Sequence, residues 1–477
     1  MRAQLGVVFV CGLILPLLGG FLSGCGQSAP SGELAPGKAG ASGQTSAGGA
    51  ANSGSLAGSS GSSAAGSAGT TTLGGAGGSL SSGGTGAAGS SAAGGSIGGA
   101  AGGTAGGGTA GGAGAGGGSP STCPVVSDFA TWPAGKGPLD LGKLAVTDFK
   151  THTGEDYHYA LALSWAGALR FSSLTADASN DAALISTFNS SKIKSSPPPN
   201  PVGKGDVDAR VYGVLPLEIY LHNRDESAKK LGLDRAENQW LPPLNPEGIT
   251  SDARYWADDM FMITGLQVMA YRASKDPNIL DRSAKAILIY AGRLQKSGLF
   301  WHTMDSKVAW GRANGWFASG MTELLLELPV GQARDGVMAA YKQHLDALLP
   351  LQMSGGNDDG CWRQVLDLSS APAETSCTAM FTTALATGAK NGWLTDPKYA
   401  AAARKGWQCL ANKTNTAGKL DRTCPGTGAA KTGDALAAQQ KFYVDLMTNT
   451  QLGDLHGQLA LFWAANALIA TDCPGVR

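Results

Sequence analysis

Apolar positions in the C-terminal part of the chain recur with the spacing of α-helices. From about residue 155 onward, apolar side chains return every three or four residues, and breakers such as the three prolines at 197–199 and Pro329 separate one run from the next. Few alternating stretches compete as strands. The pattern predicts twelve helices, at 155–171, 179–190, 208–222, 226–239, 251–274, 278–296, 313–328, 332–353, 375–391, 396–412, 432–447 and 454–470.

The predicted helices are of two kinds. The helix at 332–353 is amphipathic, with apolar residues such as Val337 on one side and charged residues such as Arg334 on another. The stretches 255–271 and 313–328 are apolar almost all round, which indicates burial on every side. Twelve helices that alternate between the two kinds predict an all-α fold, an (α/α)6 barrel with six inner and six outer helices. A helical solenoid is the alternative, but no fixed sequence repeat supports it.

The N-terminus resembles a lipoprotein signal peptide over residues 1–25. A positive charge at Arg2 precedes an apolar run that is too short and too interrupted for a membrane span. The tetrapeptide Leu-Ser-Gly-Cys that ends at Cys25 resembles a bacterial lipobox, so we expect Cys25 to carry lipid. An ordinary signal peptide with an incidental cysteine is the alternative. Residue 26 is not Asp, the residue typical of inner-membrane retention, so we expect an exported protein anchored in the cell envelope at the outer membrane.

Residues 26–121 have the composition of a disordered linker. They are nearly all Gly, Ala, Ser and Thr, and cannot bury enough apolar surface to offset the entropy lost on ordering. We expect a tether that holds a folded domain away from the membrane, although a neutral low-complexity insertion would have the same composition. One large domain, 122–477, remains.

Charge and motif content narrow the partners and cofactors that we expect. Lys+Arg and Asp+Glu both number 36, and no basic stripe occurs, so a nucleic acid partner is not expected. We expect a monomer. No CxxC or HExxH spacing indicates a metal, and no cofactor is expected.

Six cysteines remain outside the signal peptide and the lipobox, which is consistent with disulfides in an oxidising compartment. Sequence proximity favours Cys361–Cys377 and Cys409–Cys424, with Cys123–Cys473 joining the ends of the domain. Fifteen connectivities remain open.

The most apolar predicted helix contains two adjacent carboxylates, Asp258 and Asp259. A carboxylate in such surroundings must be paired, or its pKa rises until it holds a proton. A raised pKa beside aromatic side chains suits a general acid. The alternative is structural: one aspartate pairs with Arg254 and the other meets a neighbouring helix.

Other polar residues also stand among aromatic ones. Asp208 precedes an apolar helix, His302 follows Trp301, and Arg312 lies between Trp310 and Trp316. Aromatic rings stack on the apolar face of a sugar, and an arginine binds a carboxylate with two hydrogen bonds, so this set suits an acidic sugar. Each residue alone is equally consistent with core packing.

Four segments together resemble glycoside hydrolase family 105, the unsaturated rhamnogalacturonyl hydrolases, which are related to the family 88 unsaturated glucuronyl hydrolases. The segments are 256–262, 299–302, 310–316 and 374–380, in the family's order and approximate spacing. The resemblance covers roughly 145–472 and itself implies an (α/α)6 barrel. It departs at Ala313, where the family usually has glycine.

The resemblance also implies an activity. Such enzymes release a 4,5-unsaturated galacturonyl or glucuronyl residue from the non-reducing end of lyase-generated oligosaccharides, by hydrating the C4=C5 double bond. It implies Asp258 as the catalytic acid and base and Asp208 as the second carboxylate, with Asp206 close enough to be confused with it. It implies a substrate-binding set of Trp256, His302, Trp310, Arg312 and Trp316.

Several alternatives stay open at this point. A non-catalytic glycan-binding surface lipoprotein is one, and a lyase or epimerase on the same barrel is another. The second is less expected, because the six histidines show no clear pair in the sequence. Pectic rhamnogalacturonan is the default source of substrate; ulvan, arabinogalactan and glycosaminoglycan fragments are the others.

Overall fold

The computed structural model describes residues 126–152, 158–191, 194 and 207–471, which belong to one compact unit. The predicted signal peptide with Cys25, the predicted linker, Asp206 and two of the cysteines, Cys123 and Cys473, lie outside the described residues. Within these ranges, every helix falls short of the length and apolarity needed to cross a membrane.

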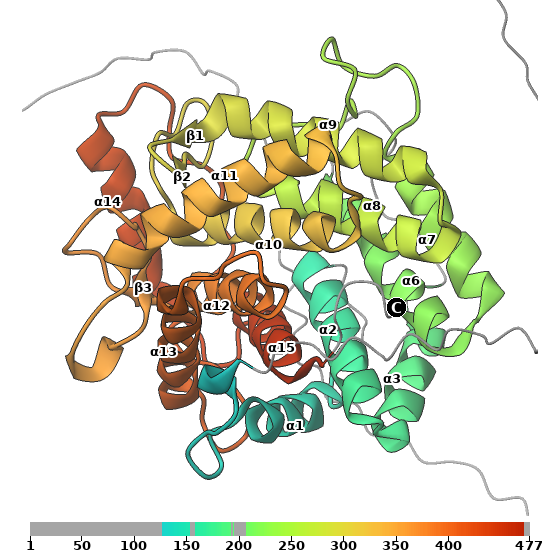
Figure 1. Ribbon diagram of the computed structural model, residues 1–477, viewed down its shortest axis with the longest axis horizontal. Helices are drawn as coiled ribbons and strands as arrows, with labels where there is room; N and C mark the ends of the chain where they lie inside the picture. The colour runs from blue at the N-terminus through green and yellow to red at the C-terminus, as the bar shows by residue number, and fades with distance from the viewer. Residues whose placement is uncertain (1–125, 153–157, 192–193, 195–206, 472–477) are drawn as a thin grey trace, which may run out of the picture. The chain divides into compact units, whose positions relative to one another are not determined.

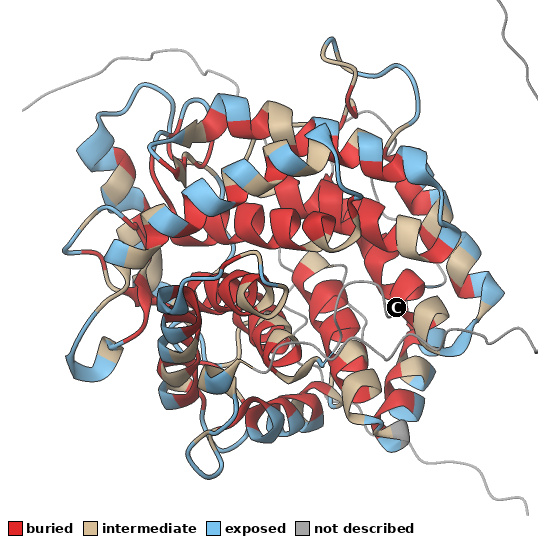
Figure 2. Cartoon of the chain, viewed as in Figure 1, coloured by how far each residue is buried: buried red, intermediate tan, exposed pale blue. Residues whose placement is uncertain are grey.

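Six helices form a closed inner ring, in which each packs against the next and the last returns to the first (Figure 1). Their side chains are buried on nearly all sides (Figure 2). In ring order they are α2 (Tyr159–Thr175), α6 (Val214–Asn223), α8 (Asp259–Ser274), α10 (Gly311–Glu327), α12 (Thr375–Lys390) and α15 (Leu455–Ile469).

Six outer helices pack on this ring and expose one face to solvent (Figure 2). In α9, for example, Ile279, Ile287 and Tyr290 are buried, whereas Asp281 on another face is exposed. The outer helices are α1 (Pro138–Phe149), α3 (Ala178–Ser190), α7 (Glu226–Asn238), α9 (Pro277–Leu294), α11 (Gln332–Leu348) and α13 (Pro397–Lys413). This arrangement confirms the predicted (α/α)6 barrel.

One of the six pairs of inner and outer helices differs from the prediction. Helix α1, which the sequence pattern did not predict, is the outer partner of α15, and the predicted helix at 432–447 is α14 (Leu436–Leu446), which lies outside the ring. Helix α1 was missed partly because Gly142 weakens helix propensity. The structure needs that glycine, since a Cβ there would lie 2.1 Å from the Phe171 ring.

The segment before α8 is a turn rather than the first part of a helix. The prediction started a helix at 251, but the observed α8 begins at Asp259, and Tyr255 has a φ of +58°. The physical reason is Asp259, whose carboxylate accepts hydrogen bonds from the backbone N–H groups of Arg254 and Trp256 and so closes a turn. Asp258 therefore lies at the N-terminal end of an inner helix, not inside it.

Short elements connect the helices at this end of the ring. A four-residue helix, α5 (Val207–Arg210), precedes α6. Two antiparallel hairpins, β1 (Gln295–Lys296) with β2 (Leu299–Phe300) and β3 (Trp362–Arg363) with β4 (Ala373–Glu374), lead toward α10 and α12. Asp208 lies in α5, and His302 follows β2.

The disulfide pairings expected from proximity are wrong where the structure describes them. Cys361 is bonded to Cys409, with a Cα–Cα distance of 5.4 Å, and Cys377 and Cys424 are free and buried. Closing a longer loop costs only slightly more entropy, so sequence proximity is a weak guide to pairing. Cys409 lies in α13, and the packing of this helix in the barrel brings it to Cys361.

The buried histidine His344 makes stability depend on pH. Burial lowers its pKa from 6.5 to about 4, so between these values the unfolded chain binds one more proton than the native one. Its contribution is present above 6.5 and is lost as the pH falls. We expect about 2 kcal/mol of the unfolding free energy to disappear at pH 5 through this residue. Chemical denaturation at pH 7 and pH 5 should show a smaller loss in His344→Gln than in wild type. An equal loss, or the same reduction in a variant of the partly exposed His152, would contradict this.

Candidate active site

Most of the residues predicted to form a site meet at the N-terminal ends of the inner helices. Asp208 lies just before α6, Asp258 caps α8, Trp310 caps α10, and His302 lies in the connection between β2 and α10. A backbone hydrogen bond joins the segment before α8 to the segment after β2, since the Ala257 N–H donates to the His302 carbonyl at 2.8 Å. Separate segments thus converge on one end of the barrel.

Asp258 is paired with His302. The Oδ2 atom of Asp258 lies 2.9 Å from Nε2 of His302, and the histidine is fully buried while 14% of the aspartate side chain is exposed. Burial pushes the pKa of Asp258 upward, but the charge and hydrogen bond of His302, with Arg254 and Arg312, hold it below its ordinary value. The expectation of an unpaired acid with a raised pKa is therefore replaced by a carboxylate paired with an imidazole.

Tyr443 of α14 contacts the other side of the His302 ring. Its hydroxyl lies 2.5 Å from Nδ1 and 2.9 Å from the Ser306 hydroxyl, and it accepts a hydrogen bond from the backbone N–H of Ala430. Burial raises the pKa of Tyr443 to about 12, so the hydroxyl keeps its proton at neutral pH. The contact at Nδ1 fixes the orientation of the imidazole, with Nε2 toward Asp258. Sequence reasoning missed this residue.

Arg254 joins the other two aspartates. Its Nε donates to Asp259 at 2.8 Å, and its two Nη atoms donate to the two oxygens of Asp208 at 2.9 and 3.1 Å. Asp259 is fully buried and also accepts from the Tyr290 hydroxyl at 2.6 Å, so its role is structural. Burial raises the pKa of Asp208, and the Arg254 guanidinium opposes that rise. A third of the Asp208 side chain, 35%, remains exposed.

Arg312 is buried, and main-chain atoms already occupy the ends of its guanidinium. Its Nη atoms donate to the carbonyls of Cys424 at 2.5 Å and Pro425 at 2.8 Å, whereas Nε has no partner. The guanidinium lies over the Trp310 ring, 4.6 Å from its centroid. The two-pronged contact with a substrate carboxylate expected from the sequence is therefore not free, and Arg312 offers a positive charge and a single N–H.

Aromatic side chains line the same region. Trp310 packs against Tyr443 at 5.6 Å, and Trp256 faces His302 at 5.3 Å between centroids. Trp316 is fully buried against Tyr159, at 6.2 Å. The indole N–H groups of both Trp310 and Trp316 are buried without a hydrogen-bond partner, which leaves two donors available at this end of the barrel.

A pair of histidines, which the sequence did not indicate, lies at the start of α2 and α15. The rings of His158 and His456 are 5.2 Å apart. His456 contacts Asp454 through Nδ1 and the Tyr159 hydroxyl through Nε2, both at 2.8 Å. Burial lowers the pKa of His456 to about 4, so the ring is neutral at physiological pH. The expectation that the histidines form no pair is wrong, because helices α2 and α15, far apart in sequence, bring His158 and His456 together.

Among residues 126–152, 158–191, 194 and 207–471, no group of three His, Cys, Asp or Glu side chains is placed to hold a metal ion. Glu374, the acidic residue of the segment 374–380, has a structural role. It caps α12 by accepting from the backbone N–H groups of Ser376 and Cys377 at 3.0 and 2.7 Å.

Comparison with known proteins agrees with this geometry. The family model described as Glycosyl Hydrolase Family 88 matches residues 142–470. The chain belongs to this family. Among solved structures, a glycoside hydrolase of family 105 from C. acetobutylicum is similar in fold, with a TM-score of 0.60 at 17% identity, over 69% of this chain and 98% of that one. The resemblance drawn from the four sequence segments is confirmed at the level of the family 88 and family 105 group.

Individual relatives are more distant. The family 88 chain is 31% identical, over 35% of its length, to an unsaturated 3S-rhamnoglycuronyl hydrolase from Alteromonas sp. (strain LOR), and the match spans 43% of that protein. It is 22% identical to the unsaturated rhamnogalacturonyl hydrolase YesR from Bacillus subtilis, over 53% of this chain and 74% of YesR. The chain thus spans less than half the length of the first of these relatives.

Proposed function

We propose that this family 88 protein releases 4,5-unsaturated uronic acids from the non-reducing end of lyase-generated oligosaccharides. The observation that carries the proposal is the Asp258–His302 pair, held at 2.9 Å at the N-terminal end of α8, with Tyr443 on the far side of the imidazole. An ordinary glycosidase works with two carboxylates that flank the glycosidic bond. Here one carboxylate has an imidazole partner, and the other is bound on both oxygens by Arg254.

The first step is proton transfer to the double bond. The C4=C5 bond of the substrate is a vinyl ether, because C5 carries the ring oxygen. Its electron pair takes the proton of the protonated Asp258 carboxyl, which becomes a carboxylate beside His302. A C4–H bond forms, and positive charge develops on C5 and the ring oxygen. Because His302 is fully buried with both ring nitrogens against protein groups, we assign it to holding Asp258 rather than to the expected contact with sugar.

The second step is addition of water. Water bonds to C5 while the Asp258 carboxylate takes its proton, so the same residue serves as acid and then base. The product is a hemiketal, in which the bond between C5 and the ring oxygen breaks to give a ketone at C5. The former ring oxygen is then a hydroxyl on C1, and C1 expels the neighbouring sugar as an alcohol to become an aldehyde. One water is consumed, and no cofactor takes part.

The remaining residues bind and orient. Asp208, held by Arg254 and partly exposed, accepts a hydrogen bond from water or a sugar hydroxyl. Arg312 supplies positive charge and its unpartnered Nε–H toward the substrate carboxylate. Trp256, Trp310 and Trp316 supply apolar faces and indole N–H groups.

The names of the relatives guide the choice of substrate. The Alteromonas protein is named for a rhamnoglycuronyl substrate and YesR for a rhamnogalacturonyl one. We therefore propose an unsaturated uronic acid linked to rhamnose, with pectic rhamnogalacturonan as the default source. Chromatography of digests from pectin, ulvan, arabinogalactan and glycosaminoglycan lyases should show release of the second sugar from at least one digest. Failure on all of them would overturn the proposal.

Removing the Tyr443 hydroxyl should slow catalysis through His302. Tyr443→Phe keeps the ring against Trp310 but loses the hydrogen bond to Nδ1, so we expect kcat to fall about tenfold, with little change in KM and a shifted pH profile. Tyr399→Phe, which loses a surface hydrogen bond to Asp346, is the matched control. An unchanged kcat and pH profile in Tyr443→Phe would remove Tyr443 from the mechanism.

The proposed location is the cell envelope, through a lipid on Cys25 that follows a signal peptide and precedes a linker of low complexity. Cells expressing the full chain should incorporate labelled fatty acid into it and retain it in the membrane fraction. Cys25→Ser should abolish labelling and release the protein. Labelling that persists in Cys25→Ser would refute the anchor.

A further inference from the structure

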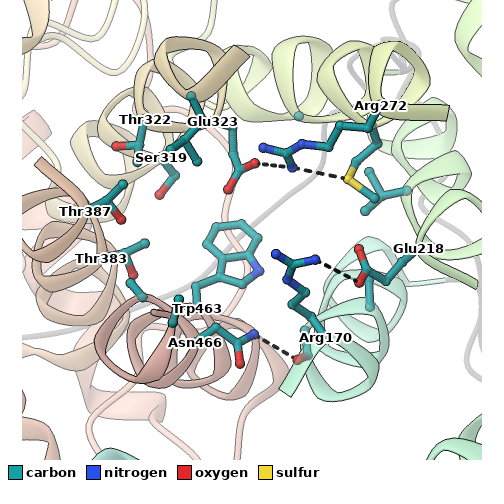
Figure 3. A pocket seen from close by; sticks show the side chains of 18 of the residues that line it. Arg170, Glu218, Arg272, Ser319, Thr322, Glu323, Thr383, Thr387, Trp463 and Asn466 are labelled. Carbon is teal, nitrogen blue, oxygen red and sulfur yellow. Dashed lines mark hydrogen bonds and ion pairs between the residues drawn. The ribbon is translucent and has the colours of Figure 1, made fainter. Parts of the chain in front are cut away.

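We propose that the barrel contains a second binding site, at the end opposite the active site, for a neutral polyhydroxyl compound about the size of one sugar ring. A cavity of about 150 Å³ lies among the C-terminal halves of the six inner helices, and every one of these helices contributes to its lining (Figure 3). None of the side chains assigned to the active site lines it. The proposal goes beyond the proposed function and does not depend on it.

An aromatic layer separates this cavity from the active site. Phe261 and Trp463 line the cavity, and their rings lie 4.3 Å apart. Trp316 packs on both, at 5.7 and 5.8 Å, and faces Tyr159 of the active-site end. These rings lie between the cavity and the residues of the candidate active site.

Four residues that line this space carry buried polar atoms without hydrogen-bond partners. The hydroxyl of Ser319 has no hydrogen bond although the residue is only 2% exposed. The side-chain oxygens of Asn466 and Asn391 and one terminal nitrogen of Arg272 are likewise buried and unpaired. All four residues line the cavity. A buried polar group left unpaired costs about 1–3 kcal/mol, so these atoms call for an occupant with both donors and acceptors.

The arginines of the cavity already have carboxylate partners. Arg272 pairs with Glu323 at 2.6 Å and Glu327 at 2.7 Å, and Arg170 lies 4.0 Å from Glu218. Figure 3 shows these two pairs on the same side of the cavity. An anionic ligand would have to displace a carboxylate to reach either arginine, and a cationic ligand would have to displace an arginine.

The remaining cation is also occupied. Lys390 donates to the carbonyls of Ala467, Leu468 and Ala470, at 2.8, 2.6 and 2.9 Å, and so caps the end of α15. The C-terminal ends of the inner helices point toward this end of the barrel, and their dipoles disfavour negative charge there. The ligand that fits is therefore neutral.

Trp463 indicates what kind of neutral ligand fits. Its indole extends into the cavity with Asn466 below it and Arg170 beside it (Figure 3). An indole face packs on the C–H face of a sugar, and Ser319 and the two asparagines supply the donors and acceptors that hydroxyl groups need. The cavity volume of about 150 Å³ is suited to one sugar ring.

Binding of simple sugars to the full chain tests the proposal. The probes are d-galactose and l-rhamnose, with sodium d-galacturonate as the charged counterpart. Affinity is followed by saturation-transfer NMR, and crystals soaked in each probe locate it. We expect the soaked crystals to show the neutral sugars in the cavity and no galacturonate there.

Ser319→Ala provides the variant, because it removes a hydroxyl that has no partner in the free protein and so should leave thermal unfolding unchanged. It should weaken binding of the neutral sugars about 5- to 30-fold. Ser283→Ala, a buried serine of α9 outside the cavity, should have no effect on binding. Galacturonate located in this cavity in the soaked crystals, unaltered affinity for the neutral sugars in Ser319→Ala, or a cavity that holds only water would each overturn the proposal.

Discussion

Replacing Asp258 by Asn should lower kcat on an unsaturated disaccharide by about 10²- to 10⁴-fold, because Asn can neither donate nor accept the proton that C4 and water require. The side chain keeps its size at the N-terminal end of α8, so the fold should be retained. Initial rates, together with circular dichroism and a melting curve, measure both effects. Asp234→Asn is the control, since it makes the same chemical change in an exposed carboxylate that pairs with Lys230. Turnover in Asp258→Asn at more than a tenth of the wild-type rate would remove Asp258 from the role of acid and base.

Replacing Arg254 by Met should produce the largest loss of stability. Arg254 is the charged partner of Asp259, which is fully buried, and breaking a buried ion pair by removing one partner costs about 3–5 kcal/mol. The same change frees Asp208, which loses two hydrogen bonds, so kcat should fall as well. Urea denaturation measures the first effect and initial rates the second.

A second substitution separates charge from packing in this experiment. In Arg254→Met with Asp259→Asn, the buried charge is gone, so part of the lost stability should return. Lys230→Met, which breaks an exposed pair with Asp234, should change the unfolding free energy by less than about 1 kcal/mol. If Arg254→Met proved no more destabilising than Lys230→Met, Arg254 would not hold this site together.

The barrel could be predicted because its signal is local. Each helix shows its buried face in the spacing of its own apolar residues, and the contrast between 332–353 and 255–271 separated outer from inner helices. The sixth hairpin could not be predicted the same way. Its outer member, α1, precedes α2 and joins α15 across the whole length of the domain, and such a pairing leaves no trace in either helix alone.

The candidate site could likewise be predicted where its signal is local, but not where it depends on contacts between distant segments. Asp258 stood out because a carboxylate in an apolar segment needs a partner, and the family resemblance gave it a role. That its partner is His302, with the pKa of Asp258 lowered rather than raised, depends on a contact between residues far apart in the chain. Tyr443 is farther still, 141 residues from His302, on a helix outside the ring.

Fully buried Arg312 illustrates a limit of reasoning from residue type. An arginine between two tryptophans suggests a free guanidinium for a carboxylate, but the carbonyls at Cys424 and Pro425 take its ends. The cysteines show the same limit, because helix packing, not sequence distance, selects Cys361 and Cys409. Contacts of this kind are set by tertiary structure, which overrides local expectation.

The central claim is that the reaction is hydration of a double bond, and one assay tests it directly. The C4=C5 bond conjugated to the carboxylate absorbs in the ultraviolet, and hydration destroys that absorbance. Wild-type protein is mixed with an unsaturated uronyl-rhamnose disaccharide and, separately, with its saturated counterpart, while absorbance and released rhamnose are followed together. We predict that absorbance falls in step with rhamnose release from the unsaturated disaccharide and that the saturated one stays intact. Release of rhamnose from the saturated disaccharide, or release from the unsaturated one without loss of absorbance, would contradict the account.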